Sequence, residues 1–186
     1  MEKKKVLALI GGISSQSLNQ KLFKVFQELA PENFELEQFP IERIPFFSQD
    51  LEKDPPAIVR DLRSQIKESA AILIISPEYN RSFPGVLKNA IDWGSRPYGQ
   101  SSWDNKIAAV AGASVGNIGT FGAQHHLRQV LAYLNVRTMG QPEFYLNASE
   151  SFDENGNLKK SGQKEFIQKY WGAFSSWIQS NQEAAS

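Results

Sequence analysis

The sequence contains no cysteine among its 186 residues. This absence excludes disulfides, thiolate nucleophiles, and zinc or iron-sulfur sites that are built on cysteine. The only histidines, His125 and His126, are adjacent, so on a helix they point about 100° apart and do not form an i,i+4 metal-binding pair. We therefore predict no metal site, and redox chemistry in this chain would need a bound cofactor.

Neither sign of charge is in excess, because 20 Lys and Arg balance 20 Asp and Glu. Without a long block of like charge, a nucleic acid or an anionic membrane is disfavoured as a partner. Long hydrophobic runs are also missing, since the apolar run at residues 6–10 is too short for a signal peptide core or a membrane span. These features predict a cytoplasmic protein that binds a small molecule.

Three apolar runs without polar alternation, at residues 6–10, 70–76 and 107–114, are typical of parallel strands covered on both faces. Segments with helical spacing lie between them, an alternating segment at residues 34–39 suits a less buried strand, and residues 142–146 suit a fifth strand. We predict one α/β domain over residues 1–186, a flavodoxin-like, doubly wound, five-stranded parallel sheet with helices on both faces, or else a short dinucleotide-binding variant.

In such sheets a ligand binds beyond the carboxyl ends of the strands, which directs attention to residues 11–17, 77–83 and 113–120. The first of these segments has two glycines at a strand end and leads into a helix, an arrangement that favours an anion. No P-loop lysine follows, and GxGxxG is absent because Ile13 and Gln16 replace glycines, so we expect a phosphate that serves only as a handle. The alternative is a plain turn with Ser15 or Ser17 as an N-cap. The candidate binding residues are Gly12, Ser14, Ser15, Gln16, Ser17 and Asn19.

The second segment crowds polar side chains between a strand and a helix that we expect Ser82 or Phe83 to cap, with Pro84 in its first turn. Backbone amides, a tyrosine and an asparagine there can bind a planar heterocycle. The alternative is an ordinary connection, with Lys88 and Asp92 as a surface i,i+4 pair. The third segment is rich in glycine, which permits close approach of a ligand or merely a flexible turn. The candidates in these two segments are Pro77, Glu78, Tyr79, Asn80, Ser114 and Gly116.

Taken together, GGISSQSLN, PEYNRSFPGVLKNAIDWGSRP and GASVGNIG resemble the NADPH-dependent FMN reductase family, which includes flavodoxin-like quinone, chromate and azo-dye reductases. The resemblance implies that the first segment holds the phosphate of FMN through Ser17 and Asn19. It implies that residues 77–80 lie along the isoalloxazine ring and that Ser114 and Gly116 close its other side. It also implies a homodimer or homotetramer.

One position departs from the family pattern, because Ser14 stands where many members carry an arginine, so one charge-assisted phosphate contact is missing. Arg81, directly after the PEYN tetrad, supplies a cation near the predicted site, and its role is left open.

The resemblance predicts an FMN-dependent oxidoreductase that passes two electrons from NADPH or NADH to a quinone, a flavin or a similar small acceptor by a ping-pong route. FMN would carry the chemistry, so no side chain is expected to act as a catalytic acid or base. The alternatives are a flavodoxin-type electron carrier, a Rossmann-type dehydrogenase that binds ribose through Glu37, and a flavin-free domain that only shares the fold.

Overall fold

The computed structural model describes residues 3–149, 151–154 and 156–183. The main elements alternate along the chain in the way that the apolar runs predict. In chain order they are β1 (Lys4–Ile10), α1 (Leu18–Glu28), β2 (Phe34–Phe39), η1 (Ile41–Arg43), η2 (Gln49–Leu51), α2 (Ala57–Glu68), β3 (Ala71–Ile75), α3 (Gly85–Gly94), β4 (Ile107–Ser114), α4 (Phe121–Tyr133), β5 (Arg137–Thr138), β6 (Phe144–Asn147) and α5 (Ser161–Glu183).

The strands form one parallel sheet in the order β2-β1-β3-β4-β5, and β6 also pairs with β4. This is the flavodoxin-like order, in which the chain reverses direction across the sheet between β1 and β3. The predicted fold class is confirmed in its order, its parallel pairing and its helices on both faces. The apolar runs of the central strands β1, β3 and β4 are buried, as predicted for strands covered on both faces.

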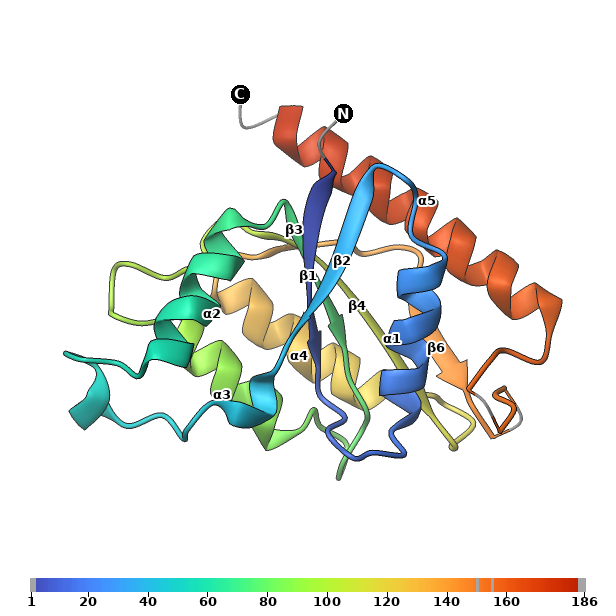
Figure 1. The fold of residues 1–186 in the computed structure, drawn as a ribbon, viewed down its shortest axis with the longest axis horizontal. Helices are drawn as coiled ribbons and strands as arrows, with labels where there is room; N and C mark the ends of the chain where they lie inside the picture. Colours follow the sequence, from blue (N-terminus) through green and yellow to red (C-terminus); the bar gives the residue numbers. More distant parts are fainter. Residues whose placement is uncertain (1–2, 150, 155, 184–186) are drawn as a thin grey trace.

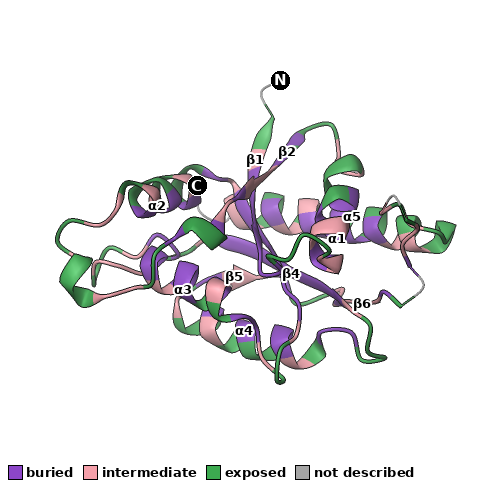
Figure 2. Cartoon of the chain, turned by 60° about the horizontal axis from the view of Figure 1, so that its bottom comes forward, coloured by how far each residue is buried: buried purple, intermediate pink, exposed green. Residues whose placement is uncertain are grey.

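Alternate residues of each strand belong to two separate cores, one on each face of the sheet. On β1, Val6 and Ala8 pack with α1 and α5, whereas Leu7 and Leu9 pack with α2, α3 and α4. Figure 1 shows α2 and α3 to the left of the strands and α1 and α5 to the right. In Figure 2 the central strands are mostly purple and buried, while the outer faces of the helices are pink or green. The sheet therefore separates α1 from α4, which lie on opposite faces.

The fifth strand differs from the prediction, which placed it near residues 142–146. The structure has two short strands, β5 and β6, on the same edge of β4. Residues 139–143 leave the sheet between them, and Pro142 within this segment has no backbone N–H to donate to a ladder. Opposite the interruption, the buried Tyr170 hydroxyl of α5 donates to the Val110 carbonyl oxygen at 2.9 Å. A side chain thus replaces a missing ladder bond, and burial raises the pKa of this phenol well above its usual range.

Candidate functional site

Three loops meet where β1, β3 and β4 end, at the bottom of Figure 1. The first loop is residues 11–17, the second loop is residues 76–84 and the third loop is residues 115–120. They lie side by side because β3 pairs with both β1 and β4. Gly11 allows the first two loops to touch, since a Cβ atom built there would lie 3.2 Å from Cδ of Pro77. The predicted loops are therefore brought together at the carboxyl ends of the strands.

The first loop is held by Ser17, the N-cap residue of α1. Its Oγ accepts from the backbone N–H groups of Asn19 and Gln20 at 3.2 and 3.3 Å. Gly12 must lack a side chain here, because a Cβ atom built on it would lie 2.2 Å from that Oγ. The backbone of Gly12 thus packs directly on the cap. The exposed stretch from Ser14 to Gln16 lies just before the positive end of the α1 dipole, with the Gln16 N–H turned onto the Ser14 hydroxyl at 3.3 Å.

Asn19, for which the resemblance implies a phosphate contact, binds the end of β4 through its side chain. Its side chain is 2% exposed, and its amide donates to the Ala113 carbonyl oxygen at 3.0 Å and accepts from the Ala113 N–H at 2.9 Å. This pair of bonds joins the first turn of α1 to the last residues of β4. Asn19 therefore fixes the first loop relative to the third loop, and its amide oxygen and nitrogen are both engaged within the protein.

Replacing Ser17 by alanine is expected to weaken FMN binding, if this loop seats a phosphate, by about 0.5 to 3 kcal/mol, the range for one hydrogen bond to a charged group. Loss of the cap should lower the free energy of unfolding by about 1 kcal/mol. Fluorescence titration of the apoprotein with FMN and chemical denaturation measure the two effects. Lower stability with unchanged FMN affinity would show that Ser17 is only a helix cap.

The second loop contains a tight hairpin turn at its tip. Tyr79 and Ser82 exchange two backbone hydrogen bonds of 2.9 and 3.0 Å, and the two residues between them, Asn80 and Arg81, have φ values of 52° and 65°. Such a turn needs positive φ at both central positions. The following helix begins at Gly85, with Pro84 as the N-cap residue, so the prediction that Ser82 or Phe83 caps this helix was wrong. The turn leaves the Tyr79 ring 55% exposed at the edge of the site.

Glu78 ties the second loop to the helix that follows the third loop. Its carboxylate accepts from the Ala123 N–H in the first turn of α4 at 3.0 Å and from Arg81 Nη1 at 3.0 Å. The side chain is only 9% exposed, so its charge depends on these two partners. Gly122 makes room, since a Cβ atom built there would lie 3.1 Å from the carboxylate. The side chain predicted for the ring thus holds the two loops in register.

The third loop is closed by the hydroxyl of Ser114, which donates to the Gly119 carbonyl oxygen at 2.6 Å and accepts from the Gly116 N–H at 3.2 Å. Gly119 has φ of 60°, and a Cβ atom there would lie 2.8 Å from Cβ of Tyr145. Burial is the main cause that raises the pKa of the Tyr145 phenol, followed by its hydrogen bond to Glu143. Tyr145 therefore stays protonated near neutral pH and supports the loop as a neutral group.

Large apolar side chains stand exposed on all three loops and on the start of α4. Exposed apolar surface of this kind often marks a ligand site. Its members are Ile13, Tyr79, Val115, Ile118 and Phe121. A flat, mostly apolar ring could cover part of this surface. The start of α1 lies at the same carboxyl end of the sheet.

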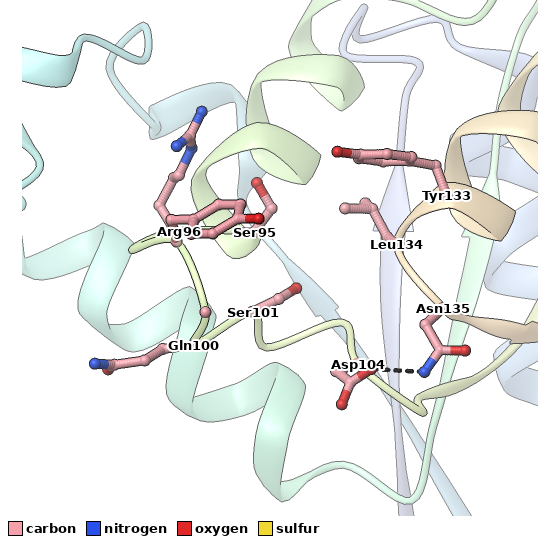
Figure 3. A pocket seen from close by; sticks show the side chains of 10 residues that line it. Ser95, Arg96, Gln100, Ser101, Asp104, Tyr133, Leu134 and Asn135 are labelled. Atoms are coloured by element: carbon pink, nitrogen blue, oxygen red, sulfur yellow. Dashed lines mark hydrogen bonds between the residues drawn. The ribbon is translucent and has the colours of Figure 1, made fainter.

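A cavity of about 590 Å³ lies elsewhere, at the opposite end of the sheet, near the residues that precede β4 and β5. Figure 3 shows its lining between the segment after α3 and the end of α4, where Asn135 donates to Asp104 at 2.7 Å. Tyr98 and Tyr133, both largely exposed, flank it. We place the site at the loops and not in this cavity, because ligands of doubly wound sheets bind at the carboxyl ends of strands.

The other residues that the sequence singled out have structural positions. Glu37 lies inside β2 and pairs with Lys5, so it is not at a strand end as ribose binding would require. Lys88 and Asp92 form the predicted surface pair at 2.7 Å. His126, for which the sequence predicted no role in a metal site, has its Nδ1 2.7 Å from the Ser82 hydroxyl. No sequence signal pointed to that contact, because it joins two elements that are 44 residues apart.

Comparison with known proteins agrees with this geometry. Residues 4–151 match the model of the family described as NADPH-dependent FMN reductase. A 2-hydroxy-1,4-benzoquinone reductase of Burkholderia is 42% identical over 175 residues, covering 94% of this chain and 96% of that protein. The flavoenzyme NAD(P)H:(acceptor) oxidoreductase FerB of Paracoccus denitrificans is similar in structure, with a TM-score of 0.90, 41% identity, and coverage of 96% of this chain and 98% of that one. A flavodoxin of Pseudomonas aeruginosa, at 17% identity, TM-score 0.60, and coverage of 94% of this chain and 99% of that one, shares the fold alone.

Proposed function

Because this chain belongs to the NADPH-dependent FMN reductase family, we propose that its three loops bind FMN and that it reduces quinones with NADPH or NADH. One observation carries the proposal: three loops meet at the carboxyl ends of β1, β3 and β4. The first loop leads into a helix without a P-loop lysine, the second is held by its hydrogen bonds to α4, and the third is rich in glycine. When bound, FMN takes a hydride from the nicotinamide and passes two electrons to the acceptor.

The first loop fits a phosphate that is held and not transferred. Residues 13–16 are exposed directly before α1, and the helix dipole favours an anion there. We propose that Ser14, Ser15, Gln16 and Ser17 donate to the phosphate through backbone N–H and hydroxyl groups, and that Asn19 positions this loop against β4. The loop contains no Lys or Arg, so backbone dipoles and hydroxyls provide the attraction.

The second and third loops fit a flat ring. Pro77 is buried against Gly11, and the hairpin turn presents Tyr79 and Asn80 outward. We propose that this part of the loop borders the isoalloxazine and that Gly116 closes the other side. Glu78 and Ser114 act through the loops that they hold, because their polar atoms are engaged within the protein. These residues orient the donor and the acceptor and exclude water, and none of them needs to move a proton.

Recovery of the cofactor tests the proposal. FMN, and not FAD, is expected as the main flavin released by heating the purified protein, because the first loop offers one helix start and no GxGxxG turn for a pyrophosphate. Chromatography of the supernatant against both standards decides the matter. FAD as the main species, or a protein that neither contains flavin nor gains it on addition of FMN, would overturn the assignment.

Donor and acceptor are expected to take turns at one place. The exposed apolar side chains of the three loops and of the start of α4 lie at the carboxyl ends of the strands, and the cavity of Figure 3 lies at the opposite end of the sheet. Double-reciprocal plots of rate against NAD(P)H concentration should therefore give parallel lines at several fixed quinone concentrations. Intersecting lines would indicate that both substrates bind together, contrary to a shared site.

We further propose that the protein is one domain, that it works in the cytoplasm with nicotinamide nucleotides, and that it forms a homodimer or homotetramer. The exposed Phe46, Tyr98 and Tyr133 support self-association, since large exposed aromatic side chains often lie at subunit contacts. Among the described residues, no helix is long and apolar enough to cross a membrane.

A further inference from the structure

Arg81 is the one lysine or arginine in the three loops that surround the site. Its side chain is 75% exposed, and within the described part of the chain its guanidinium pairs with Glu78, through Nη1 at 3.0 Å. The other guanidinium donors face solvent at the junction of the second loop and α4, where the Arg81 carbonyl oxygen approaches Gly122. Arg81 is therefore the basic side chain of the loops that an anionic ligand at this part of the site would meet.

The backbone at Arg81 is unusual for this residue type. With φ of 65° it occupies the second central position of the hairpin turn, where glycine is strongly preferred. A left-handed residue other than glycine or asparagine is strained, and such strain gathers at functional sites. The turn itself does not require a guanidinium, so a ligand contact gives a reason for keeping an arginine at this position.

Arg81 is poorly placed to replace the arginine that the family carries at position 14. It contacts Glu78, which is bonded to α4, and α4 packs on the opposite face of the sheet from α1. Among the described residues, the Arg81 guanidinium is paired with Glu78, and no hydrogen bond or ion pair joins it to the first loop. The anion that Arg81 can reach therefore belongs to a second ligand and not to the phosphate seated by the first loop.

We propose that Arg81 binds a phosphate group of the nicotinamide dinucleotide donor and so determines the affinity for that donor; this rests on the function proposed above. NADPH offers two kinds of anionic group, the pyrophosphate and the 2′-phosphate, and a guanidinium suits either. Glu78 holds Arg81 near the third loop until the donor arrives, and the hydrogen bond to the Ala123 N–H keeps this carboxylate stabilised when Arg81 turns toward the phosphate.

The test compares Arg81→Gly, Arg81→Lys and wild-type holoenzyme. Arg81→Gly should raise the melting temperature, because glycine adopts a positive φ without strain. The same change should weaken binding of the nicotinamide donor about 10- to 100-fold, the range for one charge-assisted hydrogen bond. Arg81→Lys should retain part of the affinity. The readouts are dissociation constants of NADP⁺ and NAD⁺ by calorimetry, and kcat/KM for NADPH and NADH with a neutral quinone. A matched control is Arg60→Ala, which removes an exposed arginine of α2 that pairs with Asp54.

The two donors distinguish the phosphates. A loss confined to NADP⁺ and NADPH identifies the 2′-phosphate, and an equal loss for both nucleotides identifies the pyrophosphate. Unchanged donor constants in Arg81→Gly, or equal losses in Arg60→Ala, would overturn the inference. A loss of FMN affinity that accounts for the whole effect would overturn it as well. If neither nucleotide reduces the wild-type flavin, the proposed function itself fails, which is a separate result.

Discussion

Replacing Gly12 by alanine is expected to reduce FMN affinity about 100-fold or more, which corresponds to about 2.8 kcal/mol. The new Cβ atom would lie 2.2 Å from Oγ of Ser17, so the serine must leave its position. Its hydrogen bonds to the N–H groups of Asn19 and Gln20 would be lost, and the loop before α1 would open. The fold should survive, because a lost cap costs only about 0.5 to 2 kcal/mol.

The matched control is Gly172→Ala on α5, where a built Cβ atom meets nothing within 4 Å. This change should stabilise the helix by about 1 kcal/mol and leave FMN binding unchanged. Titration of both apoproteins with FMN, together with circular dichroism, makes the comparison. Equal FMN affinity in the two variants would mean that the first loop does not bind the phosphate.

Replacing Gly112 by alanine is expected to cause the largest loss of stability, about 3 kcal/mol or more. The added methyl group would lie 2.1 Å from Oγ1 of Thr120 and 2.4 Å from the backbone oxygen of Ser76. Ser76 directly follows β3, and its N–H donates to the Ala111 carbonyl oxygen of β4 at 3.0 Å, so its backbone cannot move without disturbing the end of the β3–β4 ladder. For a chain of this size the melting temperature should fall by roughly 6 to 12 °C.

A control for this prediction is Gly140→Ala, at a position between β5 and β6 that has no atom within 4 Å of a built Cβ. Its melting temperature should stay close to that of the wild-type protein. Scanning calorimetry of both variants measures the difference. An equally stable Gly112→Ala protein would show that the close approach of Ser76 and Thr120, which sets the second and third loops side by side, is not needed.

The sequence predicted the parts of the fold that depend on local pattern. The unbroken apolar runs of β1, β3 and β4 indicated buried parallel strands, and the carboxyl ends of those strands located the three loops. The division of the last strand into β5 and β6 was missed. It depends on residues 139–143 leaving the sheet and on Tyr170 bonding to Val110 from 60 residues away.

The roles of polar side chains were harder to predict than their presence at the site. Asn19 and Glu78 were both predicted to contact the cofactor, and in the structure the side chain of each binds backbone of a distant element, β4 and α4 respectively. Sequence patterns report short spacings, whereas these bonds join residues 94 and 45 positions apart. The positive φ of Arg81 was also invisible, because arginine gives no signal for a left-handed turn.

The central claim is that the three loops hold FMN so that the nicotinamide donor and the acceptor exchange two electrons with it at the same place. The most direct test is to mix the FMN-loaded protein anaerobically with NADPH, without a quinone, and to follow the flavin absorbance. Our account predicts that the absorbance bleaches at least as fast as steady turnover and returns when a quinone is added. Bleaching much slower than turnover, or a flavin that only a protein partner and neither NADPH nor NADH can reduce, would contradict it.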